Sequence, residues 1–275
     1  MPDKIGPSAF IFVRVLGAGL LFWIINLFIR EKVQKKDYLR FLICAIFGVT
    51  CNQLLFFHGL NLTSPIDASI ILTTVPILVL IFSAFFLKEA ITQNKLLGIL
   101  IGGSGAIALI TYGSTAAGTS STLGNLFVLL NCISYALYLV LVKPLMKKYK
   151  PFTVITWIFT IGFVFVMPIS FNDFQATDVR KFTIGTYYTI AYVIIGTTFL
   201  TYLLNIFALS KVSPSVNGSY IYLQPVISFI MVSLYAQTFN DKTYSNEIDI
   251  VKVMSCLMVV SGVYLISKKP KKVTA

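Results

Sequence analysis

Long apolar segments separated by short polar connections dominate the pattern of this chain. Nine such segments can be marked off by the polar residues at their ends, and each is close to the roughly 20 residues that a helix needs to cross about 30 Å of hydrocarbon. Lipid offers no partner to backbone N–H and C=O groups, so we expect helices; a β-barrel would need shorter, alternating segments. The predicted helices are Ser8–Ile29, Leu39–Leu60, Ile66–Leu87, Leu96–Tyr112, Leu123–Val142, Phe152–Ile169, Thr183–Leu209, Val216–Tyr235 and Ile250–Ser267.

Composition shows that these helices belong to a membrane protein. Of the 275 residues, 57% are hydrophobic and 12% are charged, and the mean hydropathy is +0.85. A soluble domain carries about 25% charged residues, so a water-soluble fold is excluded. The fold class that follows is an all-α polytopic membrane protein with nine transmembrane helices.

Lysine and arginine are distributed unevenly between the two ends of the predicted helices. If the C-terminus is cytoplasmic, 16 of the 22 basic residues lie at cytoplasmic connections and 5 lie on the other side. This bias is typical of the positive-inside rule, and it explains the net charge of +12 without a nucleic-acid partner. We therefore expect an integral protein of the plasma (inner) membrane, with a cytoplasmic C-terminus and a basic tail over residues 269–275.

The sequence carries no motif that indicates a catalytic, metal or cofactor site. The four cysteines lie in apolar stretches without a CxxC spacing, and His58 is the only histidine, so we expect no metal site. No phosphate-binding loop of the Walker A type occurs in the sequence. We expect no cofactor and no catalytic residue, and therefore a protein that is not an enzyme.

A spacing of prolines repeats along the chain. A Ser-Pro pair ending at Pro65 is followed eleven residues later by Pro76, and a second pair ending at Pro214 is followed eleven residues later by Pro225. Each pair stands where one predicted helix ends and the next begins. Proline removes an intrahelical hydrogen bond and kinks a helix, so Pro76 and Pro225 are candidate hinges; a static kink that serves packing is the alternative.

The repeat divides the chain into two halves. We expect a first repeat over residues 1–112, a linker over 113–122 and a second repeat over 123–268. The first half holds four predicted helices and the second holds five, and an odd number of helices per repeat makes the repeats inverted. We therefore expect that one helix is missing before Pro7 and that the sequence is truncated there, with a natural nine-helix protein as the alternative.

The order of these motifs resembles the drug/metabolite transporter superfamily, in particular the EamA-type carriers. The first copy resembles the family's second to fifth helices, and a weaker second copy follows. The segments that carry the resemblance are Pro7–Arg14, Asn52–Leu60, Thr63–Glu89, Gly98–Ile110 and Tyr202–Ser267.

The resemblance implies ten helices in two inverted repeats, a central cavity between them, alternating access, and export of amino acids, nucleosides or other small metabolites. This chain departs from the family by lacking the first helix and by carrying Gln237 and Thr238 where the first copy has Lys88 and Glu89. We expect a secondary transporter that exports a small polar metabolite resembling an amino acid or a nucleoside. The alternatives are a non-transporting membrane subunit or scaffold, and a membrane enzyme that acts on lipids.

Polar and aromatic residues recur at helical spacing on three predicted helices. Polar side chains inside a membrane bundle face protein or water, so these stripes are expected to line a cavity for a small-molecule substrate. Hydrogen bonding between helices is the alternative for each single residue. Asn52 and Gln53, from the segment Asn52–Leu60 that resembles the family's third helix, are added to these stripes. The candidate substrate-binding residues are Asn52, Gln53, Asn131, Tyr135, Tyr138, Thr198, Tyr202, Asn205, Asn217, Tyr220 and Gln224.

Two further features have two interpretations each. Arg14 lies inside the first predicted helix, where it either binds an anionic group of the substrate or extends to the membrane interface. Gly98 and Gly102 allow close helix contact, either within the monomer or across a dimer interface. The oligomeric state stays open.

Overall fold

The fold is entirely helical over the residues that the structure describes. A computed structural model describes residues 5–29, 31–113, 121–239 and 250–268, and no strand occurs in these ranges. The predicted linker falls largely, and the predicted basic tail falls wholly, outside the described residues. In chain order the elements are α1 (Pro7–Ile29), η1 (Lys35–Asp37), α2 (Tyr38–Ala45), η2 (Ile46–Cys51), α3 (Asn52–Leu62), α4 (Pro65–Leu72), α5 (Val75–Leu87), α6 (Gln93–Gly113), α7 (Thr122–Leu141), α8 (Lys143–Met146), α9 (Pro151–Ala176), η3 (Val179–Lys181), α10 (Ile184–Tyr192), η4 (Val193–Leu200), α11 (Thr201–Lys211), α12 (Pro214–Ser219), η5 (Tyr220–Tyr222), α13 (Leu223–Phe239) and α14 (Ile250–Ser267).

The predicted class of all-α polytopic membrane protein is confirmed. In the described part of the chain, 8 helical stretches are long and apolar enough to cross a membrane, and they coincide with eight of the predicted segments. The remaining predicted segment, Val216–Tyr235, is covered by α12, η5 and α13. The boundaries differ by a few residues, and the largest difference is at α9, which continues through Pro168 to Ala176, beyond its predicted end at Ile169.

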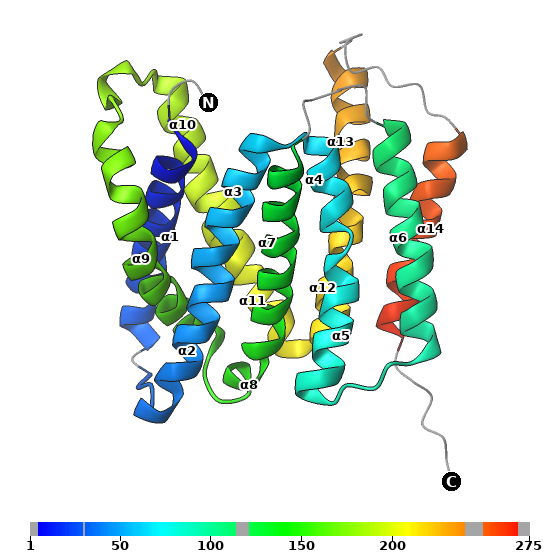
Figure 1. The fold of residues 1–275 in the computed structure, drawn as a ribbon, viewed down its shortest axis with the longest axis horizontal. Coiled ribbons are helices and arrows are strands. Elements are labelled where there is room, and N and C mark those ends of the chain that lie inside the picture. Colours follow the sequence, from blue (N-terminus) through cyan, green and yellow to red (C-terminus); the bar gives the residue numbers. More distant parts are fainter. Residues whose placement is uncertain (1–4, 30, 114–120, 240–249, 269–275) are drawn as a thin grey trace.

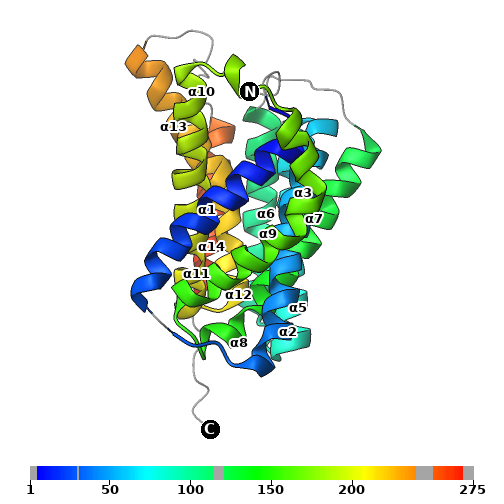
Figure 2. The same ribbon diagram turned by 90° about the vertical axis from the view of Figure 1, so that its left-hand side faces the viewer.

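The membrane-spanning stretches run up and down the molecule in Figure 1, and successive stretches alternate in direction. α1 begins at the upper end of the view in Figure 1, and α14 ends at the lower end. α1 and α9 pack along each other on one side of the molecule, and α6 and α14 pack along each other on the other side. Figure 2 shows the face formed by α1 and α9, and α3, α7 and α11 lie between the two pairs in Figure 1.

Both repeated prolines lie where a helix is interrupted. α4 ends at Leu72 and α5 starts at Val75, so Pro76 occupies the first turn of a new helix, where its missing N–H costs least. In the second half the 3₁₀ turn η5 separates α12 from α13, and Pro225 lies in the first turn of α13. The same interruption therefore recurs at the same spacing, although the role of these prolines as hinges stays a prediction.

A π-helical segment also occurs in each half of the chain, which the sequence did not predict. The π-helical segments η2 and η4 interrupt two helical stretches of equal length, Lys35–Leu62 and Ile184–Lys211, each of 28 residues. A π-helical turn leaves backbone carbonyls displaced from the regular ladder and is frequent at functional sites. η2 contains Gly48 and η4 contains Thr198, and both residues take part in polar contacts inside the bundle.

Glycines bring α6 and α14 into backbone contact. A Cβ atom on Gly98 would lie 2.6 Å from the carbonyl oxygen of Gly262, and one on Gly105 would lie 2.8 Å from the carbonyl oxygen of Ser255. Gly102 also packs against Gly262. The small-residue face of α6 is therefore occupied by a helix of the same chain, which is the monomer alternative left open above.

We predict that Gly98→Ala lowers the free energy of unfolding by about 1–3 kcal/mol, because the added methyl group meets backbone atoms that cannot rotate away. Thermal unfolding in detergent, followed by the monomer peak in size-exclusion chromatography, measures this loss. Gly19→Ala is the matched control, because a Cβ atom at Gly19 meets nothing within 4 Å. Equal unfolding temperatures for the two variants would contradict the close contact of α6 with α14.

Candidate functional site

The hydroxyl of Tyr202 is the centre of a polar cluster inside the bundle. It accepts a hydrogen bond from Gln53 Nε2 at 2.9 Å. It lies 3.1 Å from Asn52 Oδ1 and 3.2 Å from the carbonyl oxygen of Gly48, and it donates its single proton to one of these two acceptors. The Tyr202 ring meets Phe159 edge to face, with 4.9 Å between ring centroids. Tyr202 thus joins α11 to the π-helical segment η2 and to the start of α3.

The hydrogen bond between Gln53 and Tyr202 joins equivalent positions of the two halves. Gln53 lies eleven residues before Ser64, and Tyr202 lies eleven residues before Ser213, the serines of the two Ser-Pro pairs. Two equivalent positions meet where an approximate two-fold axis passes between inverted repeats. Gln53 and Tyr202 are thus related by the same spacing as the Ser-Pro pairs that define the predicted repeats.

A second group of hydrogen bonds connects α7, α11 and α12. Asn205 Nδ2 donates to the Tyr135 hydroxyl at 2.7 Å, and Asn217 Nδ2 lies 3.5 Å from Asn205 Oδ1. Asn131 Nδ2 donates to the carbonyl oxygen of Asn52 at 2.8 Å, which links this group to the Tyr202 cluster. Four of the predicted residues, on three different helices, thus converge with Asn52, Gln53 and Tyr202.

Three predicted residues stand apart from this network. The Tyr138 side chain is 1% exposed and its ring packs directly over Gly48, where it fills the core. Tyr220 is 51% exposed, and Gln224 is also exposed; neither forms a hydrogen bond with the described cluster residues. Their part in substrate binding stays a prediction.

Arg14 lies beside the Tyr202 cluster as a buried cation. It is 9% exposed, its Nε donates to Thr198 Oγ1 at 3.0 Å, and its guanidinium lies 4.6 Å from the centroid of the Phe57 ring and 5.5 Å from that of Phe10. Thr198 in turn donates to the carbonyl oxygen of Val193 within the second π-helical segment.

Arg14 has no acidic partner among the residues that the structure describes. The ion pairs in those ranges are Lys95 with Glu89 and Lys148 with Asp37, and the two terminal amino groups of Arg14 make no hydrogen bond there. A buried charge without a counter-charge is costly, so this arrangement suits an anionic group supplied from outside the chain. The position of Arg14 inside a helix is evident from the sequence, but its pairing with Thr198, which is 184 residues away, is not.

Contacts at the lower end of Figure 1 connect the two halves around Glu89. Lys95 Nζ donates to Glu89 Oε1 at 2.6 Å. Burial of the Glu89 carboxyl opposes its ionisation, but Lys95 and the nearby hydroxyls of Ser215 and Ser213 outweigh this effect and hold the pKa of Glu89 below its ordinary value. The second carboxylate oxygen and the Ser215 hydroxyl do not reach hydrogen-bond geometry, so the serines act mainly through their dipoles.

Two more contacts hold the same end together. Lys143 Nζ donates to the carbonyl oxygens of Leu209 at 2.5 Å and Val212 at 2.6 Å, at the C-terminus of α11, where a cation is favoured by the helix dipole. Lys148 and the Tyr149 hydroxyl both donate to the carboxylate of Asp37, and this raises the pKa of Lys148. Together with the contacts of Glu89, these hydrogen bonds join the polar segments between the helices at the lower end of the bundle.

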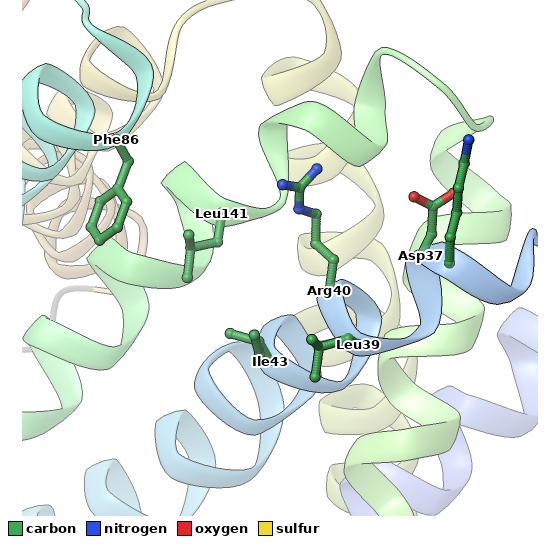
Figure 3. A pocket seen from close by; sticks show the side chains of 7 residues that line it. Asp37, Leu39, Arg40, Ile43, Phe86 and Leu141 are labelled. Carbon is green, nitrogen blue, oxygen red and sulfur yellow. The ribbon is translucent and has the colours of Figure 1, made fainter.

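A groove of about 530 Å³ opens at the same end between α2, α5 and α7 (Figure 3). None of the predicted substrate-binding residues lines it, so it is separate from the Tyr202 cluster. Its lining residues are Lys36, Asp37, Leu39, Arg40, Ile43, Phe86 and Leu141.

Comparison with known families agrees with the predicted resemblance. The EamA-like transporter family matches residues 1–111 and 122–268. Among curated proteins, "Uncharacterized transporter YyaM" of Bacillus subtilis (strain 168) is 27% identical over 86% of this chain and 75% of its own length. A protein of Archaeoglobus fulgidus described as "Uncharacterized transporter" is 26% identical over 96% of this chain and 90% of its own length. The resemblance drawn from the motifs is therefore confirmed.

A solved crystal structure has the same fold. It superposes with a TM-score of 0.74 and covers 96% of this chain and 88% of the solved chain, at 16% sequence identity. At this identity the likeness concerns the fold alone.

We predict that the contribution of Glu89 to stability depends on pH. Because its folded pKa is depressed, the stabilisation is fully present above the unfolded pKa of about 4.3 and is lost as the pH falls through the folded pKa. Glu89→Gln is therefore expected to lower the thermal unfolding midpoint at neutral pH, and the difference from the unchanged protein is expected to vanish in acid. Asp173→Asn, at an exposed position of α9, is the control and should show no such difference. A Glu89→Gln difference that stays constant down to about pH 3 would refute this assignment.

Proposed function

Because this chain belongs to the EamA-like transporter family, we propose that it is a secondary transporter that moves a small polar metabolite across the plasma membrane by alternating access, and not an enzyme. The observation that supports this most strongly is the Tyr202 cluster. Hydroxyl and amide groups from α3, α7, α11 and α12 converge there, inside an apolar bundle, at equivalent positions of the two halves. Secondary carriers built from inverted repeats bind their substrates at such a junction.

The chemistry of the cluster favours an amino acid over a nucleoside. Gln53, Asn52 and Tyr202 offer neutral hydrogen-bond donors and acceptors that suit either substrate. Arg14 adds a buried guanidinium beside them, and a guanidinium binds a carboxylate through two parallel hydrogen bonds. A zwitterionic amino acid supplies this carboxylate, whereas a nucleoside carries no anion. We therefore propose an amino acid or a related carboxylate as the substrate.

The contacts at the lower end support a role in alternating access. We assign this end to the cytoplasm, because most of the basic residues lie there. Opening toward the cytoplasm then requires Glu89 to separate from the Ser213 region and Lys143 to leave the carbonyl oxygens of α11. The interruptions at Pro76 and Pro225 are the proposed hinges for this movement.

Transport into proteoliposomes tests this proposal. We predict uptake of one or more labelled amino acids from a panel that also contains nucleosides. Arg14→Gln is expected to reduce amino-acid uptake about tenfold or more, because a charge-assisted hydrogen bond contributes roughly 1.5–3 kcal/mol. Arg14→Lys, which keeps the charge, should retain more activity, and Arg180→Gln at an exposed position should change nothing.

Competition by amines that lack the carboxylate separates a substrate contact from a structural one. The unchanged protein should discriminate strongly against the amine, and Arg14→Gln should lose most of this discrimination. Uptake of nucleosides but not amino acids would refute the substrate assignment. No flux of any panel member by the folded protein would favour a non-transporting subunit, and lipid turnover in detergent would favour an enzyme.

A further inference from the structure

We propose that the groove between α2, α5 and α7 is a binding site for an anionic phospholipid of the cytoplasmic leaflet. The groove is formed at the lower end of the bundle, beside the first turns of α2 and the last turns of α5 and α7. It is separate from the Tyr202 cluster, so this proposal does not depend on the identity of the transported substrate.

The charges in the groove favour an anion. The side chains of Lys36 and Arg40 line it, and neither side chain forms an ion pair or a hydrogen bond in the described part of the chain. Asp37 is the acidic residue in the lining, but its carboxylate already accepts hydrogen bonds from Lys148 and from the Tyr149 hydroxyl. Lys36 lies near the same carboxylate, but its attraction to it is weaker than that of Lys148. The groove therefore presents Arg40 without an acidic partner in the described part of the chain, and Lys36 with a charge that Asp37 offsets only in part.

The position of Arg40 suits a phosphate group. In Figure 3 its guanidinium extends from α2 into the space beside Leu141, while Leu39 and Ile43 lie below it. Planar guanidinium groups bind phosphate oxygens through paired hydrogen bonds, and Lys36 supplies a second, more mobile positive charge. Basic pockets between transmembrane helices on the cytoplasmic side are typical binding sites for anionic headgroups.

The apolar walls distinguish a lipid from a free phosphate. Leu39 is 67% exposed and Phe86 is 48% exposed, and both belong to segments long and apolar enough to lie in the membrane. Ile43 and Leu141 complete the apolar lining. Inorganic phosphate gains nothing from these side chains, whereas acyl chains bury them. The volume of about 530 Å³ lies within the range of roughly 300–1,000 Å³ that is typical of small-ligand sites, which is enough for a headgroup and the adjoining part of the chains.

Lipid binding there would link three helices of the cytoplasmic end. Asp37 lies directly before α2 and accepts a hydrogen bond from Lys148, which follows α8. Glu89 lies just after α5 and pairs with Lys95. A phospholipid seated between α2, α5 and α7 would therefore stabilise the arrangement in which these contacts are intact. We expect anionic lipid to raise the thermal unfolding midpoint, and zwitterionic lipid with the same acyl chains to raise it less.

Native mass spectrometry of the full chain in detergent tests the proposal, with phosphatidylglycerol and phosphatidylcholine of identical acyl chains as probes. We predict that phosphatidylglycerol binds about 25-fold more tightly, since each of the two basic residues near an anionic headgroup contributes about a factor of five. The double variant Lys36→Gln/Arg40→Gln should reduce phosphatidylglycerol binding to the level of phosphatidylcholine. The control Lys88→Gln/Lys211→Gln, at exposed positions of the same end, should keep the preference.

A third variant distinguishes loss of the lipid site from misfolding of the double variant. Ile43→Trp fills the groove but leaves both basic residues in place, and it should also abolish the preference for phosphatidylglycerol. Three results would overturn the proposal: equal binding of the two lipids, an equal loss in the Lys88→Gln/Lys211→Gln control, or displacement of the lipid by inorganic phosphate at a comparable concentration. The last result would identify a free-phosphate site instead.

Discussion

A polar group inside a bilayer must find its partner within the protein, and the centre of this structure follows from that constraint. Neither lipid nor the surrounding Phe and Ile side chains can bond to a hydroxyl or an amide, so an unpaired group there costs free energy. The Tyr202 hydroxyl meets this demand by accepting from Gln53 and donating toward Asn52 or Gly48. The same interactions join the two halves of the chain at equivalent positions. One buried hydroxyl thus explains how the halves meet, and its surroundings are where we propose that a polar substrate binds.

The π-helical segments η2 and η4 present polar backbone atoms to the side chains at the centre of the bundle. In η2 the carbonyl oxygen of Gly48 lies within reach of the Tyr202 hydroxyl. In η4 the displaced carbonyl of Val193 accepts from Thr198, which leaves the Thr198 oxygen free to accept from Arg14. The two segments therefore present polar atoms to the centre of the bundle while most of the backbone keeps its hydrogen bonds.

The helices were predictable from the sequence because the thickness of the membrane fixes the length of an apolar segment. Lipid offers no hydrogen-bond partner to the backbone, and a helix pairs its own backbone groups. The interruptions before Pro76 and Pro225 followed equally from local chemistry. The partners inside the bundle were not predictable, because hydrogen bonds between residues such as Arg14 and Thr198 join positions that are distant in sequence and have no local signal. Helical spacing grouped Asn131, Tyr135 and Asn205 correctly as inward-facing, but it did not separate them from exposed Tyr220 and Gln224. The interruption at η5 separates Tyr220 from α12, so the regular period used for the prediction fails there.

The central claim is that the Tyr202 cluster binds substrate and does more than hold helices together. Equilibrium binding of the panel of labelled amino acids to the purified protein, measured beside its thermal unfolding midpoint, separates these roles. For Tyr202→Phe and Gln53→Leu, this account predicts that binding is lost while most of the unfolding midpoint is kept, because a hydrogen bond between membrane helices contributes only about 0.6 kcal/mol. Unchanged amino-acid affinity in variants whose unfolding midpoint has fallen would show that the cluster is structural and would contradict the account.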